Sequence, residues 1–383
     1  MYFDNNASTL TDPEINKLFQ EINSNIGVGN PHSAEHRHGW NADSIIEDSK
    51  HIIANYINAL PDEIYFTSGA TESNNWAIIG AGLSAIKEKS NRTEIIVSSI
   101  EHKCVLNAAH FLKEFHGFDI KEAPINDQGI VDLEKLQHLV TDRTLLVSIM
   151  AANNEIGTFQ PINEIGHICR GRGTIFHVDG AQGAYSNLDV IKNNIDMLSL
   201  SGHKIYAPKG IGCLYISEDL KPKPIPLMHG GHQQNGLRAG TLSPALCRSL
   251  AKALEILEEV KDKEIKHLTS LRSQFLRFLN DNNIAFEING DMNNRHPGNL
   301  NIQLIGVDAK TFITRLQPNI AISTGSACNA GTFKSSYVLK ALGLKDHQIN
   351  CSFRIGFGRF NTEYELDKAS RQILKILKSA APN

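Results

Sequence analysis

The stretch TIFHVDGAQGAYSNLDVIKNNIDMLSLSGHK, residues 174–204, decides the fold class. It contains two short apolar runs, TIFHVD and MLSLS, and a glycine follows each run. Four similar runs flank it, EIYFT, EIIVSS and TLLVSIMAA before it and GCLYIS after it, with helix-like stretches between them from about residue 60 to 217. Short apolar runs bounded by turns are typical of buried strands, and their alternation with helices is typical of a parallel sheet. The sequence therefore predicts an α/β fold with a mostly parallel sheet.

A long helical region separates this part of the chain from a second unit. Residues 242–282 carry leucines at helical spacing, with no Gly or Pro after Pro244. Beyond it lie three strand candidates, AFEI, NLNIQL and SFRIGF, and two expected helices at 335–342 and 363–378. We therefore expect a large α/β domain over residues 14–255 and a smaller α+β domain formed by residues 1–13 and 256–383.

Composition and charge exclude several classes of protein. The 383 residues are 41% hydrophobic and 21% charged, as in a globular protein of about two domains. The formal net charge of −3 shows no basic excess, so direct nucleic-acid binding is not expected. The sequence contains no 18-residue apolar run and no leader-like segment at MYFDNNAST, and we expect a cytoplasmic protein without a membrane span.

The cysteines and histidines do not predict a metal site. The six cysteines, at 104, 169, 213, 247, 328 and 351, include no close pair of the C-x-x-C type. His32, His36 and His38 cluster in the sequence, but no acidic or cysteine partner accompanies them in a common zinc spacing. We therefore expect no bound metal, and any cysteine with a function acts alone as a thiol.

Two polar residues follow the strands of the opening stretch. Lys204 comes just after MLSLS, and desolvation in a dry pocket lowers the pKa of a lysine and lets its amine form a Schiff base. Asp179 ends the run TIFHVD, where a carboxylate can hold a pyridinium nitrogen protonated. Taken singly, Lys204 could be a solvated surface lysine and Asp179 a helix cap or turn residue.

A third feature is the segment EIYFTSGATESNN, a strand followed by small and hydroxyl residues and then a helix. Backbone amides at a helix N-terminus, with hydroxyl groups beside them, form a cradle for phosphate. The same residues could serve only to cap the helix, with Ser68 or Thr71 as the cap. A phosphate cradle, a Schiff-base lysine and a carboxylate together specify pyridoxal phosphate.

Nine motifs in order then resemble one family. They are NPHSAEHRHGW (30–40), GATESNN, SSIEHKCVL, ANNEIG, HVDGAQ, SGHK, GGHQQNGLRAGT, STGSAC and FRIGFGRF, and matching segments run from DNNAST to GRF. The chain resembles the cysteine desulfurases, in the class V branch of fold-type I pyridoxal-phosphate enzymes. This resemblance implies a seven-stranded, mostly parallel sheet flanked by helices, with a smaller α+β domain.

The resemblance also implies roles for single residues. Lys204 would hold the cofactor covalently, and Arg354 would bind the substrate carboxylate together with Asn153. The remaining cofactor contacts would come from Asp179 at the pyridine nitrogen, Gln182 at the ring hydroxyl, His102 stacked on the ring, and Ala70, Thr71, Ser201 and His203 around the phosphate. Thr241, in RAGT, would contact the phosphate bound by the other subunit of a homodimer.

Cys328, in the motif STGSAC, would be the catalytic thiol that receives sulfur as a persulfide. The segment around it, about residues 323–334, is rich in Gly, Ala and Ser, which favours a mobile loop suited to a carrier. Other lone cysteines are more often inert packing residues, and we expect this of Cys169, Cys213, Cys247 and Cys351. For Cys104, two residues after His102, we also prefer packing, although a second active thiol stays open.

The predicted function is therefore conversion of L-cysteine to L-alanine, with sulfur passed from Cys328 to an acceptor protein. The acceptor could belong to iron–sulfur cluster assembly, tRNA thiolation or DNA phosphorothioation, and the short tail after GRF fits a dedicated donor at least as well as a general iron–sulfur role. One alternative is a class V aminotransferase or a lyase acting on another amino acid, which has no use for Cys328. Another is a non-catalytic scaffold that relays sulfur.

Overall fold

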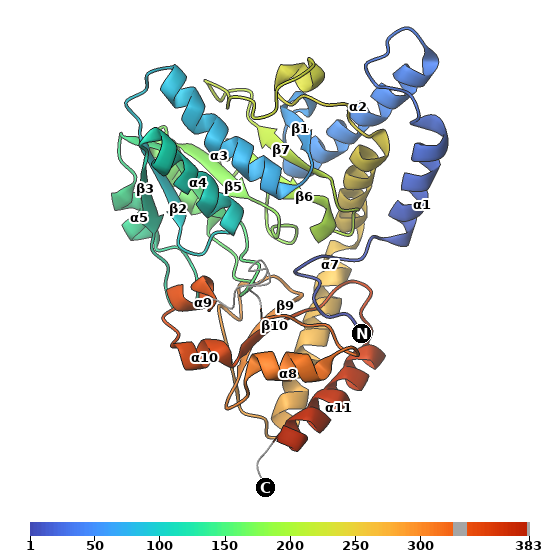
Figure 1. The fold of residues 1–383 in the computed structure, drawn as a ribbon, viewed down its shortest axis with the longest axis vertical. Helices are drawn as coiled ribbons and strands as arrows, with labels where there is room; N and C mark the ends of the chain where they lie inside the picture. Colours follow the sequence, from blue (N-terminus) through green and yellow to red (C-terminus); the bar gives the residue numbers. More distant parts are fainter. Residues whose placement is uncertain (325–334, 381–383) are drawn as a thin grey trace.

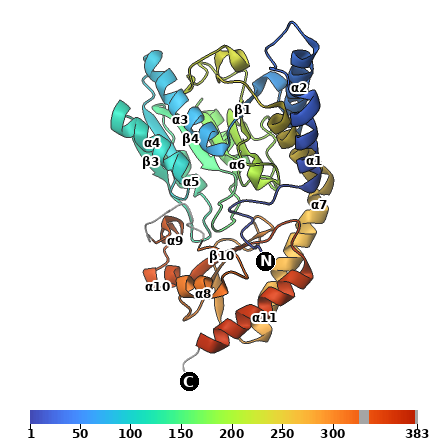
Figure 2. The ribbon, with the colours of Figure 1, turned by 45° about the vertical axis from the view of Figure 1, so that its right-hand side comes forward.

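The computed structural model describes residues 1–324 and 335–380 and contains two β-sheets, one above the other (Figure 1). The upper part holds the larger sheet between layers of helices, and the lower part holds a small sheet with helices on its outer side. One long helix, α7 (Pro244–Asp281), runs through both parts. The chain starts where the two parts meet, so the N-terminal segment lies beside the small sheet (Figures 1 and 2).

The large sheet has seven strands in the order β1-β7-β6-β5-β4-β2-β3. Neighbours from β6 to β3 pair in parallel, and β7 is antiparallel to both β6 and β1. This confirms the predicted mostly parallel, seven-stranded sheet. The strands are β1 (Ile64–Thr67), β2 (Glu94–Ser98), β3 (Asp119–Ala123), β4 (Thr144–Met150), β5 (Ile175–Asp179), β6 (Met197–Ser201) and β7 (Gly212–Ile216).

Helices cover both faces of this sheet because its central strands are buried on both sides. One face packs against the apolar sides of α3 and α4, and the other against α1, α2, α5, α6 and the first half of α7. The bounds are α1 (Pro13–Glu21), α2 (Arg37–Ile57), α3 (Ala70–Lys87), α4 (Lys103–His116), α5 (Leu133–Leu139) and α6 (Ile162–Gly171), with short turns η1 (Ile22–Ile26), η2 (Pro61–Glu63), η3 (Gly202–Lys204) and η4 (Gln233–Gly236).

The small sheet is antiparallel, in the order β10-β9-β8, and has its own apolar core. Phe3 of the N-terminal segment belongs to that core, together with the second half of α7. The elements are β8 (Phe286–Ile288), β9 (Asn299–Leu304), β10 (Ser352–Gly356), α8 (Ala309–Leu316), α9 (Tyr337–Ala341), α10 (Asp346–Asn350) and α11 (Glu363–Ala380). The domain boundaries given above stay a prediction.

Two features of the described residues concern membranes and metal ions. No helix there is both long enough and apolar enough to cross a membrane. Nor do three or more His, Cys, Asp or Glu side chains of residues 1–324 and 335–380 gather in a way that could hold a metal ion.

Candidate active site

A cavity of about 450 Å³ opens where the strands of the large sheet end, on the side that faces the small sheet. Its volume lies in the range of pockets that bind small ligands. The lining residues follow the carboxyl ends of β1, β2, β4, β5 and β6, the usual place for a site in an open α/β sheet. Nine of the predicted site residues line it: Ala70, Thr71, His102, Asp179, Gln182, Ser201, His203, Lys204 and Arg354.

Lys204 lies in the short turn η3, directly after β6. Its Nζ donates hydrogen bonds to the backbone oxygens of Asn6 and Ala7, at 2.7 and 2.8 Å. The side-chain amide of Gln182 donates to the same oxygen of Asn6 at 2.8 Å. The N-terminal segment therefore forms one wall of the cavity and holds the lysine amine through neutral carbonyl groups.

Asp179 ends β5 and is 4% exposed. One carboxylate oxygen accepts a hydrogen bond from the backbone N–H of Ala181 at 2.9 Å, and the other accepts from Nδ2 of Asn74 at 2.7 Å. Both donors are neutral, and Asp179 lines the cavity. A carboxylate held in this way can form a charged hydrogen bond with a protonated ring nitrogen.

His102 is the N-cap of α4, and its ring nitrogen Nδ1 accepts the backbone N–H of Cys104 at 3.2 Å. The Sγ of Cys104 lies 3.0 Å from the same nitrogen and also accepts from Nδ2 of Asn74 at 3.2 Å. Because Nδ1 is an acceptor here, we assign the proton of the neutral ring to Nε2. Cys104 packs against the apolar core as expected, but it also lines the cavity.

The start of α3 forms the candidate phosphate cradle. Its N-cap, Gly69, has φ +146° and no side chain to cap the helix, which leaves the first amides, including those of Ala70 and Thr71, for a ligand. Gly212 of β7 lies tightly against this turn, since a Cβ there would meet the Leu200 oxygen at 2.4 Å and the Gly69 Cα at 2.6 Å. The glycine pair therefore allows the backbone to approach a phosphate group closely.

Ser201 and His203 border this turn. Ser201 ends β6, and a Cβ on Gly69 would lie 3.8 Å from its Oγ. Burial, with the positive charges of Lys204 and Lys209 nearby, lowers the pKa of His203 to about 4. In the ligand-free chain at neutral pH, His203 is therefore uncharged and can offer a hydrogen bond from its ring.

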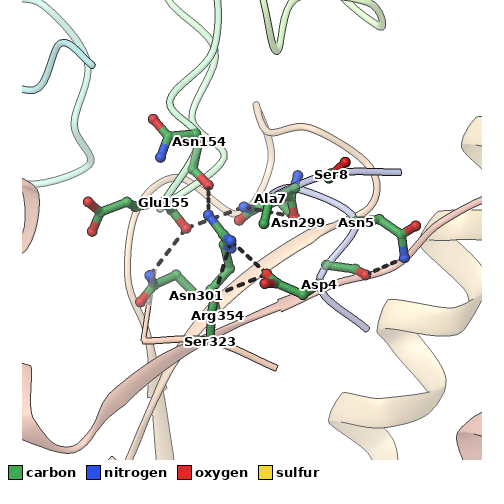
Figure 3. Close-up of polar contacts among 12 residues, drawn as sticks. Asp4, Asn5, Ala7, Ser8, Asn154, Glu155, Asn299, Asn301, Ser323 and Arg354 are labelled. Carbon is green, nitrogen blue, oxygen red and sulfur yellow. Dashed lines mark hydrogen bonds and ion pairs between the residues drawn. The ribbon is translucent and has the colours of Figure 1, made fainter. Parts of the chain in front are cut away.

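Arg354 extends from β10 of the small sheet into the cavity, with 2% of its surface exposed. Figure 3 shows its guanidinium between Asp4 of the N-terminal segment, Asn154 of the loop after β4, and Ser323. Asn153, the predicted partner of Arg354, does not line the cavity. Its amide donates to the Ile100 oxygen at 2.9 Å and its oxygen accepts from the two backbone amides that follow Asn154, so its substrate role stays a prediction.

Among the described residues, Thr241 is a second predicted site residue that does not line this cavity. Thr241 is exposed in the segment between η4 and α7, and its predicted contact is with the other subunit. Cys328 lies outside the described residues. Sequence reasoning missed Asn74, Asn6 and Asp4, although Asn74 follows Ala70 by four positions and so lies one helical turn along the same face of α3.

The residues present fit pyridoxal phosphate. That cofactor has an aldehyde, a ring nitrogen and a phosphate group, and the cavity offers an amine at Lys204, a buried carboxylate at Asp179 and uncapped amides at the start of α3. The fit to this cofactor depends mainly on one observation. The phosphate cradle and the carboxylate follow different strands of one sheet, and the carboxyl ends of these strands meet in the cavity.

Known proteins are similar to this chain over most of its length. The family model "Aminotransferase class-V" matches residues 1–369. "Cysteine desulfurase IscS" of Rickettsia felis is 43% identical over 370 residues, which cover 96% of this chain and 89% of the relative. The relative of the same name from Rickettsia prowazekii is 42% identical over 371 residues, with the same coverage.

Solved structures are similar as well. A "NifS-like protein" superposes with a TM-score of 0.90 at 33% identity, over 99% of both chains. "SspA in complex with cysteine" superposes with a TM-score of 0.81 at 36% identity, over 94% of this chain and 99% of the other. The chain therefore belongs to the aminotransferase class-V family and, within it, to the cysteine desulfurases.

Proposed function

We propose that this protein uses pyridoxal phosphate to convert L-cysteine to L-alanine and takes the sulfur onto Cys328 as a persulfide. The observation that carries the proposal is the meeting of Lys204, Asp179 and Arg354 in one cavity, in a chain 43% identical to a named cysteine desulfurase. An amine, a carboxylate and a guanidinium are the groups that this chemistry needs for the cofactor and an amino-acid substrate.

Lys204 is the residue proposed to hold the cofactor through its amine and to move protons. When bound, the cofactor would supply an electron sink for the pair of electrons left on Cα. The Asp179 carboxylate would favour a protonated ring nitrogen and so strengthen that sink. The amine of Lys204 is also the base proposed to take the Cα proton, a step in which a positioned base typically contributes about 10²- to 10⁴-fold.

Arg354 is proposed to bind the substrate carboxylate. Its guanidinium is fixed by neighbouring groups and reaches the cavity from the side opposite the large sheet. A two-pronged guanidinium–carboxylate contact sets the orientation of an amino acid as well as its affinity.

In the proposed sulfur-transfer step, the sulfur atom of L-cysteine passes to Cys328. The thiolate of Cys328 attacks the substrate sulfur, an S–S bond forms, and the Cβ–S bond breaks with its electrons going to Cβ. A proton added to Cβ gives alanine, so L-cysteine and one enzyme thiol become L-alanine and one enzyme persulfide. His102, which lines the cavity, is proposed to exchange a proton in this step.

The proposal extends to partners and location. We propose a homodimer in which Thr241 contacts the phosphate bound by the other subunit, acting in the cytoplasm. The persulfide sulfur passes to an acceptor protein of iron–sulfur assembly, tRNA thiolation or DNA phosphorothioation. The solved relatives named SspA and DndA, the latter from Streptomyces lividans and 35% identical with a TM-score of 0.78, support a sulfur-donor role of this general kind.

The test is turnover of L-cysteine by wild type, by Cys328→Ala and by a matched control, Cys351→Ala, whose cysteine lies outside the cavity. We expect wild type and the control to form alanine and sulfide, and Cys328→Ala to keep the visible absorbance of the cofactor while losing turnover. If Cys328→Ala turns over normally, Cys328 is not the sulfur carrier. If wild type forms no alanine, the proposed reaction is wrong, and an aminotransferase or lyase on another amino acid, or a non-catalytic scaffold, takes its place.

A further inference from the structure

The guanidinium of Arg354 already holds a carboxylate. Its Nη2 donates to Oδ1 of Asp4 at 2.6 Å and to Oγ of Ser323 at 3.0 Å, and its Nη1 donates to the backbone oxygen of Asn154 at 2.8 Å (Figure 3). Ser323 in turn donates to the same Asp4 oxygen at 3.0 Å. The Nε of Arg354 is buried and makes no hydrogen bond to the described residues.

These contacts occupy the nitrogen that both two-pronged edges of the guanidinium share. An arginine offers two such edges, one formed by Nη1 with Nη2 and one by Nε with Nη2. Both edges include Nη2, and Nη2 already donates to Asp4 and Ser323. A substrate carboxylate that binds to either edge therefore competes with these acceptors for Nη2.

Asp4 is the member of the pair that can move. The side chain of Arg354 is 2% exposed and that of Asp4 is 17% exposed. A buried guanidinium without a counter-charge is costly, whereas a carboxylate that turns toward water regains its hydration. Exchange of Asp4 for another carboxylate keeps the charge of Arg354 balanced at every stage, and an uncharged group cannot make this exchange.

We propose that Asp4 is an internal competitor for the substrate carboxylate site on Arg354 and sets the affinity of that site. The inference rests on the proposed role of Arg354 in binding the substrate. Asp4 acts through Arg354, without a part in the chemistry, so it is a positioning residue that determines affinity. It also selects for ligands that bring a carboxylate of their own.

The experiment compares the holoenzyme of wild type with that of Asp4→Asn, which keeps the size and the acceptor oxygen of Asp4 but removes its charge. The apparent Kd of L-alanine, the proposed product, is measured by titration calorimetry, so no turnover is needed. We expect binding to be at least about fivefold tighter in Asp4→Asn, because a competing like charge at close range has been removed. An unchanged or weaker affinity overturns the proposal.

Two controls make the result specific. Asp12→Asn removes a similar carboxylate, 3.1 Å from Arg359 and outside the cavity, and should leave the Kd of L-alanine within about twofold of wild type. Ethylamine, which is alanine without its carboxylate, should bind no more tightly to Asp4→Asn than to wild type. An equal gain with Asp12→Asn or with ethylamine overturns the proposal.

A second variant covers the case in which Asp4→Asn does not fold. Ser323→Ala keeps the ion pair but removes one of the two acceptors of Nη2, and we expect L-alanine to bind more tightly by about twofold. An unchanged or weaker affinity overturns the proposal here too. Because L-alanine binding is measured without turnover, tighter binding in a protein that forms no alanine from L-cysteine would support Asp4 as a competitor and reject the proposed reaction.

Discussion

Asp179 accepts hydrogen bonds from two neutral donors, the side chain of Asn74 and the backbone of Ala181. Its negative charge is therefore directed to the cavity, where we place the ring nitrogen of the cofactor. In Asp179→Asn that charge is lost and the nitrogen is no longer held protonated. We expect kcat for alanine formation to fall by about 10²-fold or more, measured in protein whose absorbance shows that the cofactor is still bound.

A matched control for this change is Asp196→Asn, directly before β6 of the same sheet. Asp196 is half-buried and also accepts from a backbone amide, that of Phe176 at 2.7 Å, but it does not line the cavity. Its substitution should leave kcat within about twofold of wild type. Equal losses in the two variants would mean that Asp179 acts on stability alone.

Residue types and order predict much of this site, but contacts between distant segments are not predictable from them. Lys204, Asp179 and the turn at Gly69 follow strand ends, and the carboxyl ends of parallel strands meet at one edge, so their convergence could be expected. Asp4 gave no such signal, because it approaches Arg354 across 350 residues of sequence. Cys104 was predicted to be a packing residue, and it does pack against the apolar core, in addition to lining the cavity.

At the scale of elements, His177 joins three strands in the middle of the large sheet. Its Nδ1 lies 2.8 Å from Oγ of Ser148 on β4, and its Nε2 lies 3.0 Å from Oγ of Ser199 on β6. Complete burial lowers the pKa of His177 from its usual 6.5 to about 3. Below pH 6.5 the unfolded chain therefore binds a proton at this residue that the folded chain does not bind.

It follows that the free energy of unfolding is unaffected by His177 above pH 6.5 and decreases as the pH falls below 6.5. The decrease from this one residue is about 1.4 kcal/mol per pH unit, until the folded chain also takes up the proton. We expect the free energy of unfolding, measured with denaturant from pH 7 to 5, to depend less steeply on pH in His177→Gln than in wild type. The difference in slope should be about 1.4 kcal/mol per pH unit. The exposed His167→Gln is the control, and an unchanged slope in His177→Gln would contradict the pKa assignment.

Not every element was visible in the sequence. The long helix α7 was predicted because its leucines recur at helical spacing, and nine strands were predicted because they are short apolar runs. The strand β3 was missed, since Asp119–Ala123 lies at the edge of the sheet and carries charged residues that an edge strand tolerates. Its position depends on parallel pairing with β2, which is a contact between segments rather than a property of either one.

At the scale of the whole molecule, one ion-pair cluster connects segments from both ends of the chain to α7. Oε2 of Glu264 accepts from Nε and Nη2 of Arg359 at 3.1 and 2.9 Å, and Nη1 of Arg359 lies 3.1 Å from Asp12. The guanidinium also lies 4.2 Å from the ring centre of Tyr206. Because Glu264 is 3% exposed, loss of its charge leaves Arg359 with one carboxylate fewer in a dry environment.

Glu264→Gln should therefore lower the free energy of unfolding by about 3 kcal/mol, measured by denaturant titration at neutral pH. The surface ion pair of Arg371 with Asp367 provides the control, since its side chains are 78% and 55% exposed. Asp367→Asn should change the free energy by less than about 0.5 kcal/mol. Similar effects in the two variants would show that the cluster does not connect the segments energetically.

The central claim is that sulfur leaves L-cysteine for the chain itself, in step with alanine. The most direct measurement is a single turnover of the holoenzyme with L-cysteine and no added reductant, in which alanine is quantified and the chain is weighed and mapped by mass spectrometry. We predict one added sulfur atom per alanine formed, located on Cys328. Alanine without added sulfur, or sulfur located on Cys104 and not on Cys328, would contradict the account.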